Sequence, residues 1–167
     1  ARPSRLLLWI DDYRLMQNLP KPLKRLQRRG LEVLLTQNFG PHTKYYPYLL
    51  MSKDFPKPLV TADDDIIYPP YWLDELSSAN QQTPSAIYCF RARTVRASPT
   101  GLLPFNNWPL CSTTNLCVGL FFEGVSGVIY PPQFLRHLKQ AGDNFRNVCP
   151  KHDDVWLNVN AVRGHFK

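Results

Sequence analysis

Short apolar runs that alternate with proline-opened helical segments are the feature that most restricts how this chain can fold. Sixteen prolines stand against eight glycines, a ratio that favours short elements joined by stiff loops. Strands that alternate with helices predict an α/β fold with a mostly parallel central sheet. In the first half of the chain the expected strands are RLLLWI at 5–10, LEVLLT at 31–36, PLVTA at 58–62 and SAIYCF at 85–90.

The segments between and after these runs have the patterns of helices and loops. Residues 91–115 are irregular and rich in Pro, Asn, Thr and Ser, which predicts a loop or a short hairpin. CVGLFFEG and GVSGVIYPP are typical of strand pieces around a glycine-rich bend. Because no linker of flexible composition divides the 167 residues, a single domain is predicted. Helices are expected within 21–29, 38–52, 69–79, 131–140 and 152–166.

The positive charge of the chain indicates an anionic partner. The formal net charge is +7, which favours a nucleotide, a membrane surface or a nucleic acid. Much of the charge lies in KPLKRLQRRG at 21–30, which is either a solvated helix face or a patch for anionic lipid headgroups. Nucleic-acid binding would need a contiguous basic stripe with interleaved aromatic residues, so no nucleic-acid partner is predicted.

Cysteine spacing and hydropathy exclude several other classes. The cysteines at 89, 111, 117 and 149 form no CxxC pair and are typical of buried thiols in a reducing compartment, with a Cys111–Cys117 bridge as the alternative. No apolar run reaches the roughly 18 residues of a membrane span. The opening ARPSRLLLWIDD is basic and then only briefly apolar, which favours a strand over a signal peptide.

Three adjacent carboxylates in VTADDDIIYPPYWL are the strongest chemical signal. Asp63, Asp64 and Asp65 follow an expected strand, and ligands of α/β sheets bind at the carboxyl ends of strands. Two acids at positions i and i+2 can converge on one hard cation such as Mg²⁺ or Mn²⁺ if the backbone turns there. Such a metal would stabilise a departing diphosphate. The alternative is a solvated acidic loop or a helix N-cap.

Three other segments could contribute to a site. Asp153 and Asp154 open the last helix, where they either complement the helix dipole or supply a general base. Lys44 stands at a helix start that suits a phosphate. The glycines of EGVSGVIYPP would let a backbone approach a ligand, although a tight bend also explains them. The histidines at 152 and 165 are either surface residues or metal ligands.

Together these segments resemble the sugar-nucleotide-dependent glycosyltransferases of the GT-A fold. The resemblance is closest to bacterial enzymes of polysaccharide or lipopolysaccharide assembly that carry TxDDDxxYPxxxLxxL. GPHTKYYPYL, VTADDDIIYPPYWLDEL, GVSGVIYPPQFL and CPKHDDVWLN occur in the order such proteins show, and the match covers residues 6–157. It implies a GT-A-like, Rossmann-like sheet flanked by helices in one domain over 1–167. Members normally have a strand and helix before the segment matching RLLLWI, and these cradle the nucleotide base. The resemblance therefore leaves three alternatives: an N-terminally incomplete piece of a larger protein, a donor pocket built differently, or a domain that is not a competent enzyme as it stands.

The resemblance also implies roles for individual residues. Asp63 and Asp65 match the positions that hold Mn²⁺ or Mg²⁺, with Asp64 between them. Asp153 and Asp154 match the late acidic pair, where the base that deprotonates the acceptor hydroxyl is expected. The residues expected to bind the nucleotide-sugar are Lys44, Asp63, Asp64, Gly124, Ser126, Gly127 and Trp156, the last by stacking on a sugar ring.

The function implied is transfer of a sugar from a nucleotide-sugar donor to a hydroxyl of a glycan or lipid-linked glycan. The resemblance further implies a cytoplasmic protein, with the basic helix as a candidate for peripheral contact with the inner membrane. The alternative is a degenerate transferase domain that recognises a glycan or a partner without turnover.

Overall fold

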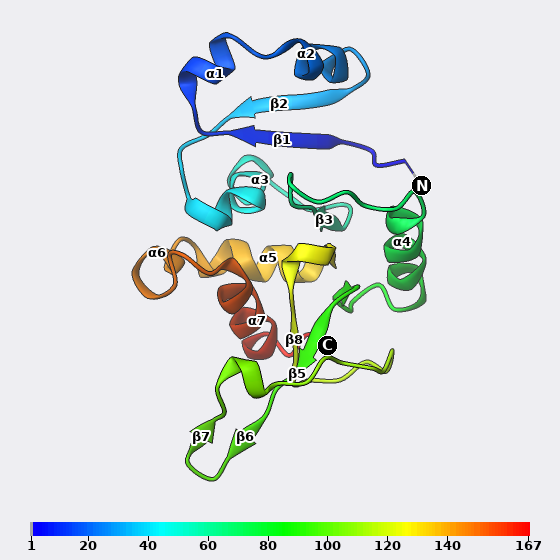
Figure 1. Ribbon diagram of the computed structural model, residues 1–167, viewed down its shortest axis with the longest axis vertical. Coiled ribbons are helices and arrows are strands. Elements are labelled where there is room, and N and C mark those ends of the chain that lie inside the picture. The colour runs from blue at the N-terminus through cyan, green and yellow to red at the C-terminus, as the bar shows by residue number, and fades with distance from the viewer. Residues whose placement is uncertain (1) are drawn as a thin grey trace.

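The computed structural model describes residues 2–167 and shows a mixed α/β protein with four small sheets (Figure 1). Strands β1 (Leu6–Ile10) and β2 (Leu31–Leu35) pair in parallel. The other three sheets are antiparallel. They join β3 (Leu59–Thr61), β9 (Val128–Tyr130) and β4 (Tyr88–Cys89) in that order, β5 (Ala92–Thr94) with β8 (Leu120–Phe122), and β6 (Ala97–Ser98) with β7 (Gly101–Leu102).

Helices occur where the proline-opened segments predicted them. The helix expected within 131–140 is α5, and the one expected within 69–79 is α4. Residues 91–115 contain the β6–β7 hairpin, as predicted. The helical elements are α1 (Tyr13–Gln17), α2 (Lys21–Gln27), η1 (Gly40–Lys44), α3 (Tyr46–Met51), α4 (Trp72–Gln82), η2 (Phe105–Asn107), η3 (Gly124–Ser126), α5 (Pro132–Ala141), α6 (Phe145–Val148) and α7 (Asp153–Arg163).

The prediction of a GT-A-like, Rossmann-like and mostly parallel central sheet is wrong. Within residues 2–167, β1 and β2 form the only parallel pair. The central strand of the three-stranded sheet is β9, which runs antiparallel to both β3 and β4. Strand–helix alternation predicts parallel pairing only when successive strands enter the sheet in the same direction. Here β9 returns in the opposite direction and separates β3 from β4.

A cavity also separates β1 from β3, so the two sheets do not join. This cavity has a volume of about 880 Å³ and is lined by residues 2–9 and 57–64. Consecutive strand residues point to opposite faces. Every residue of these two segments lines the cavity, whichever face its side chain points to. The cavity therefore runs along the edges of the strands. Among the described residues, β1 pairs only with β2 and β3 only with β9, so each presents an unpaired edge to this cavity.

The core is divided between the same two parts of the molecule. The larger cluster packs β9 and one face of α5 against α3 and α7, with Phe134, Leu135 and Leu138 fully buried. Their spacing is that of one helix face. The smaller cluster, formed by Ile10, Leu19 and Val33, lies between β1, β2 and the first two helices.

Two further predictions concern the cysteines and the membrane. All four cysteines are free thiols, so the alternative Cys111–Cys117 bridge does not form. None of the helices formed by residues 2–167 is long and apolar enough to cross a bilayer. No residue of α2 is buried, so its cations are open to solvent.

Candidate functional site

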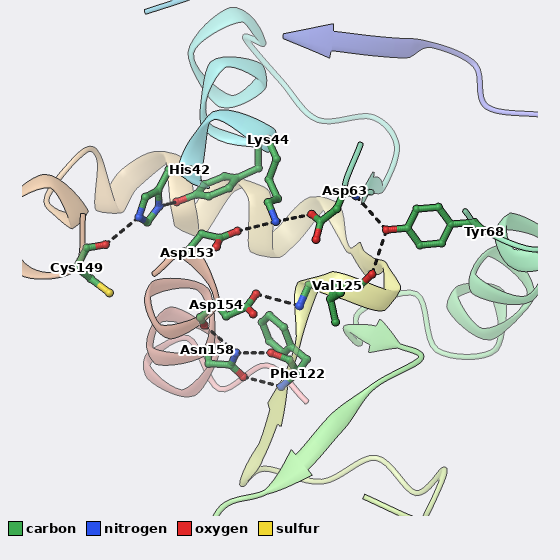
Figure 2. Close-up of polar contacts among 12 residues, drawn as sticks. His42, Lys44, Asp63, Tyr68, Phe122, Val125, Cys149, Asp153, Asp154 and Asn158 are labelled. Carbon is green, nitrogen blue, oxygen red and sulfur yellow. Dashed lines mark hydrogen bonds and ion pairs between the residues drawn. The ribbon is translucent and has the colours of Figure 1, made fainter. Parts of the chain in front are cut away.

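Four segments that are far apart in the sequence meet at one cluster of charged groups (Figure 2). Lys44, the last residue of η1, extends its ammonium between two carboxylates. Its Nζ donates to Asp63 Oδ1 at 2.6 Å and lies 3.2 Å from Asp153 Oδ2. Asp154, the next residue of α7, accepts a hydrogen bond from the Gly124 N–H at 3.0 Å. Lys44, Asp63, Asp153, Asp154 and Gly124 are called the acidic cluster below.

Gly124 belongs to the acidic cluster because its backbone lies against two of the charged side chains. A Cβ atom at this position would lie 2.9 Å from Asp154 Oδ1 and 3.5 Å from Lys44 Nζ. The first distance is shorter than carbon–oxygen contacts normally allow, so a larger residue would have to displace the Asp154 carboxylate.

Two aromatic side chains tie the loop after β3 to η3. The Asp63 N–H donates to the Tyr68 hydroxyl at 3.0 Å, and this hydroxyl donates to the Val125 carbonyl at 3.1 Å. Trp72 Nε1 donates to the Ser126 carbonyl at 2.8 Å. The rings of Tyr68 and Trp72 pack with their centroids 4.3 Å apart. The YPPYW segment therefore fixes Asp63 relative to Gly124.

Asn158 fixes the first turn of α7 against β8. Its Oδ1 accepts from the Phe122 N–H at 3.0 Å, and its Nδ2 donates to the Phe122 carbonyl at 2.9 Å and to the Asp154 carbonyl at 2.8 Å. The amide side chain thus satisfies both backbone groups of Phe122, as a neighbouring strand would. This contact holds Asp154 beside η3.

His42 joins the segment that carries Lys44 to the segment that precedes Asp153. The ring is fully buried and stacks on Phe145 with centroids 4.0 Å apart. Its Nε2 is 2.9 Å from the Cys149 carbonyl and its Nδ1 is 2.9 Å from the Tyr45 hydroxyl. Because a carbonyl only accepts, Nε2 carries the proton and Nδ1 accepts from Tyr45. Burial lowers the pKa of His42, so the ring is held neutral.

We expect His42→Leu to lower the free energy of unfolding by about 2–4 kcal/mol, because the Tyr45 hydroxyl and the Cys149 carbonyl lose their buried partner. The wild-type chain should also lose stability relative to this variant as the pH falls below about 6.5, where histidine of the unfolded chain takes up a proton. Urea unfolding between pH 5 and 8 measures both effects. His165→Asn, at an exposed histidine, is the control. Parallel pH profiles for the wild type and His42→Leu below pH 6.5 contradict the expectation.

The acidic cluster has more negative than positive charge. Burial and the charge of Asp153 raise the pKa of Asp154 to about 6, against the opposing effects of the Gly124 N–H and Lys44. Burial alone would lower the pKa of Lys44, but Asp153 and Asp63 outweigh it and the pKa is raised. Asp153 Oδ2 is buried and accepts no hydrogen bond, although it lies in ion-pair range of Lys44. Asp63 and Asp153 therefore share one ammonium, and Asp154 adds a third carboxylate to the cluster.

The predicted site residues divide into two groups. The structure brings together Lys44, Asp63, Gly124, Asp153 and Asp154. Asp64 and Asp65 are exposed in a turn after β3, with Asp64 at the cavity between β1 and β3. Ser126 and Gly127 contact Trp72. Trp156 is buried in the larger core, where it packs on Phe145. The remaining candidate metal ligands, His152 and His165, are exposed.

Neither metal-ligand geometry nor comparison with known proteins identifies a further function for the site. Within residues 2–167, no three His, Cys, Asp or Glu side chains are arranged to hold a metal ion. Comparison of the chain with protein-family models, with curated proteins and with solved structures found no match.

Proposed function

We propose that this chain is a metal-dependent glycosyltransferase that moves a sugar from a nucleotide-sugar donor to a hydroxyl of a glycan or lipid-linked glycan. The observation that carries the proposal is the acidic cluster itself. Segments 44, 63, 124 and 153–154, which the sequence resemblance singled out one by one, meet within hydrogen-bond and ion-pair distance. Helix capping and turn formation are local, so they do not by themselves account for contacts between segments so far apart in the sequence.

The donor atoms of the acidic cluster fit Mn²⁺ or Mg²⁺. Asp63 Oδ1 and Asp153 Oδ2 converge on one point, and a cationic nitrogen lies there. Carboxylate oxygens are the ligands that these hard cations prefer. Asp63 and Asp153 would hold the metal, and Asp65, which the sequence favoured, lies in the exposed turn. When bound, the metal supplies Lewis-acid stabilisation of the departing diphosphate.

The other residues of the cluster would act on the two substrates. Asp154 is proposed to take the proton of the acceptor hydroxyl. In the metal-free protein a pKa of about 6 leaves it ionised at neutral pH, as a general base must be. The Gly124 N–H holds one of its oxygens and so orients the carboxylate. The bond that forms joins the acceptor oxygen to the sugar carbon, and the bond that breaks releases the nucleoside diphosphate.

The cavity between β1 and β3 is the proposed donor site. Its volume of about 880 Å³ lies within the range of small-molecule sites. Lys44, Asp63 and Asp64 line it, so a diphosphate there would lie beside the acidic cluster. The exposed cations of α2 are proposed to contact anionic lipid headgroups, which would bring a lipid-linked acceptor close to the protein.

The proposal predicts a thermal shift that requires both metal and donor. With Mn²⁺ and a saturating UDP-, GDP- or other nucleotide-sugar, the midpoint of unfolding should rise by roughly 5–10 °C. Asp63→Asn should abolish the shift, measured from its own midpoint, because Asp63 is the proposed metal ligand. Asp65→Ala should keep most of it, since Asp65 lies in the exposed turn. If no nucleotide-sugar shifts the folded wild-type protein, the proposal fails for this chain.

A further inference from the structure

The ammonium of Lys44 lies at the point where a divalent cation would bind. It is 2.6 Å from Asp63 Oδ1 and 3.2 Å from Asp153 Oδ2 (Figure 2). The Asp153 side chain is 10% exposed, and an ionised carboxylate at such a position needs a compensating cation. Lys44 therefore serves as a counter-ion for the pair of acids.

The position and chemistry of Lys44 allow its ammonium to move. The side chain is 23% exposed and lines the cavity between β1 and β3, so a path to solvent is open on one side. A lysine ammonium is a point charge on a flexible four-carbon stem and can turn without moving the backbone. The main chain of residue 44, by contrast, is fixed by η1, which His42 ties to Cys149.

The charge of the acidic cluster favours replacement of the ammonium by a doubly charged ion. Asp63 and Asp153 both lie in ion-pair range of Lys44 Nζ, so two carboxylates share a single positive charge, and the Asp154 carboxylate lies against the same glycine backbone as the ammonium. A divalent ion at the same point would neutralise one charge more. The freed ammonium would remain in the cavity wall, where it could pair with a phosphate.

We propose that Lys44 is an exchangeable counter-ion, which holds Asp63 and Asp153 together until a divalent metal displaces it. This inference rests on the proposed function, because it concerns the same acids and the same cavity. It adds that metal and lysine compete for one position. It also makes Lys44 a positioning residue whose ammonium is released toward the donor phosphates only when the metal is bound.

The test is the affinity for Mn²⁺ alone, without nucleotide, measured from the electron paramagnetic resonance signal of free Mn²⁺. Lys44→Met should bind Mn²⁺ at least about tenfold more tightly than the wild type, because a competing charge a few ångströms from the metal has been removed. Lys57→Met is the matched control: Lys57 lines the same cavity and is exposed. It should change the affinity by less than about twofold.

The double variant Lys44→Met with Asp63→Asn should lose the gained affinity, which locates the ion at the acidic cluster. Equal or weaker Mn²⁺ binding by Lys44→Met overturns the proposal, and so does tight binding that survives in the double variant. If Lys44→Met fails to fold, the wild type itself gives the answer. Mg²⁺ should shift the Lys44 Nζ resonance in nitrogen-15 spectra and speed its hydrogen exchange, and an unchanged resonance overturns the exchange.

Failure of this inference can be told apart from failure of the proposed function. In one outcome the wild type shows the metal-dependent thermal shift with nucleotide-sugar, but Lys44→Met gains no Mn²⁺ affinity. The proposed function then stands, and only the exchange of Lys44 for metal is excluded. If no variant binds Mn²⁺ or nucleotide-sugar, both the proposed function and the exchange of Lys44 are excluded.

Discussion

Gly127→Ala is expected to lower the free energy of unfolding by about 3–5 kcal/mol, because this substitution creates both backbone strain and a steric clash. Gly127 has φ 89°, a value that L side chains rarely adopt. A Cβ atom there would lie 2.3 Å from Trp72 Cζ2 and 2.6 Å from Trp72 Nε1. Atoms cannot approach so closely, so either the indole or the η3–β9 connection must move.

Trp72 has little freedom to move away. Its indole N–H donates to the Ser126 carbonyl, and its ring packs on Tyr68. Tyr68 in turn holds the Asp63 amide. The strain of Gly127→Ala should therefore reach the loop that carries Asp63, and the variant should bind nucleotide-sugar poorly even where it remains folded.

Gly119→Ala is the matched control for the steric part of this effect. Gly119 also has a positive φ, 105°, but no atom lies within 4 Å of the position of its Cβ. Its alanine variant should lose only about 1–2 kcal/mol through backbone strain. Urea unfolding of both variants, followed by circular dichroism, measures the difference. Equal losses would mean that the contact with Trp72 contributes nothing.

The chain segments of the site could be predicted from the sequence, but the contact that joins two of its acids could not. Asp63 and Asp65 are expected to converge on one cation where the backbone turns. Residues 64–65 do form a turn, but Asp65 is exposed in it while Asp63 is half-buried at the cluster. The acid that does meet Asp63 at the cluster is Asp153, which comes from another element.

The residues that hold the cluster in place were missed because their partners are remote in the sequence. His42 pairs with the carbonyl of Cys149, 107 residues away, and Asn158 with the backbone of Phe122, 36 residues away. Polar residues among the apolar residues of the last helix were the available signal: Asn158 and Asn160 are buried on α7 together with Trp156, Leu157 and Ala161. That signal indicates a buried hydrogen bond but names no partner.

The sheet could not be predicted for a similar reason. The strand runs at 5–10, 31–36 and 58–62 are correct as β1, β2 and β3. Whether these strands have parallel or antiparallel neighbours, however, depends on where a strand from later in the chain enters the sheet. In this chain the tertiary packing of Val128, Ile129 and Tyr130, all of them fully buried, places β9 between β3 and β4. A strand of three residues is too short to carry a sequence pattern that indicates whether it pairs in parallel or antiparallel.

Asp154→Asn is expected to lower the turnover number by about 10²–10⁴, the usual contribution of a general base. Donor binding should persist, because the asparagine oxygen can still accept from the Gly124 N–H. Release of nucleoside diphosphate from the donor identified by the thermal-shift screen measures turnover. Asp143→Asn, at an acid that is 59% exposed, is the control and should keep full activity. A variant Asp154→Asn with normal turnover would exclude Asp154 as the base.

The pH dependence of stability in the metal-free wild type gives an independent check on Asp154. Without metal its pKa is about 6, so in the folded chain the carboxyl is protonated below pH 6 and ionised above it. The same raised pKa means that the folded chain binds this proton more tightly than the unfolded chain. Its contribution to stability is therefore complete below about pH 4 and is lost as the pH rises through 6. Asp154→Asn should remove this part of the stability profile. If the profile of the variant is the same as that of the wild type, the Asp154 carboxyl does not have the raised pKa that the acidic cluster predicts.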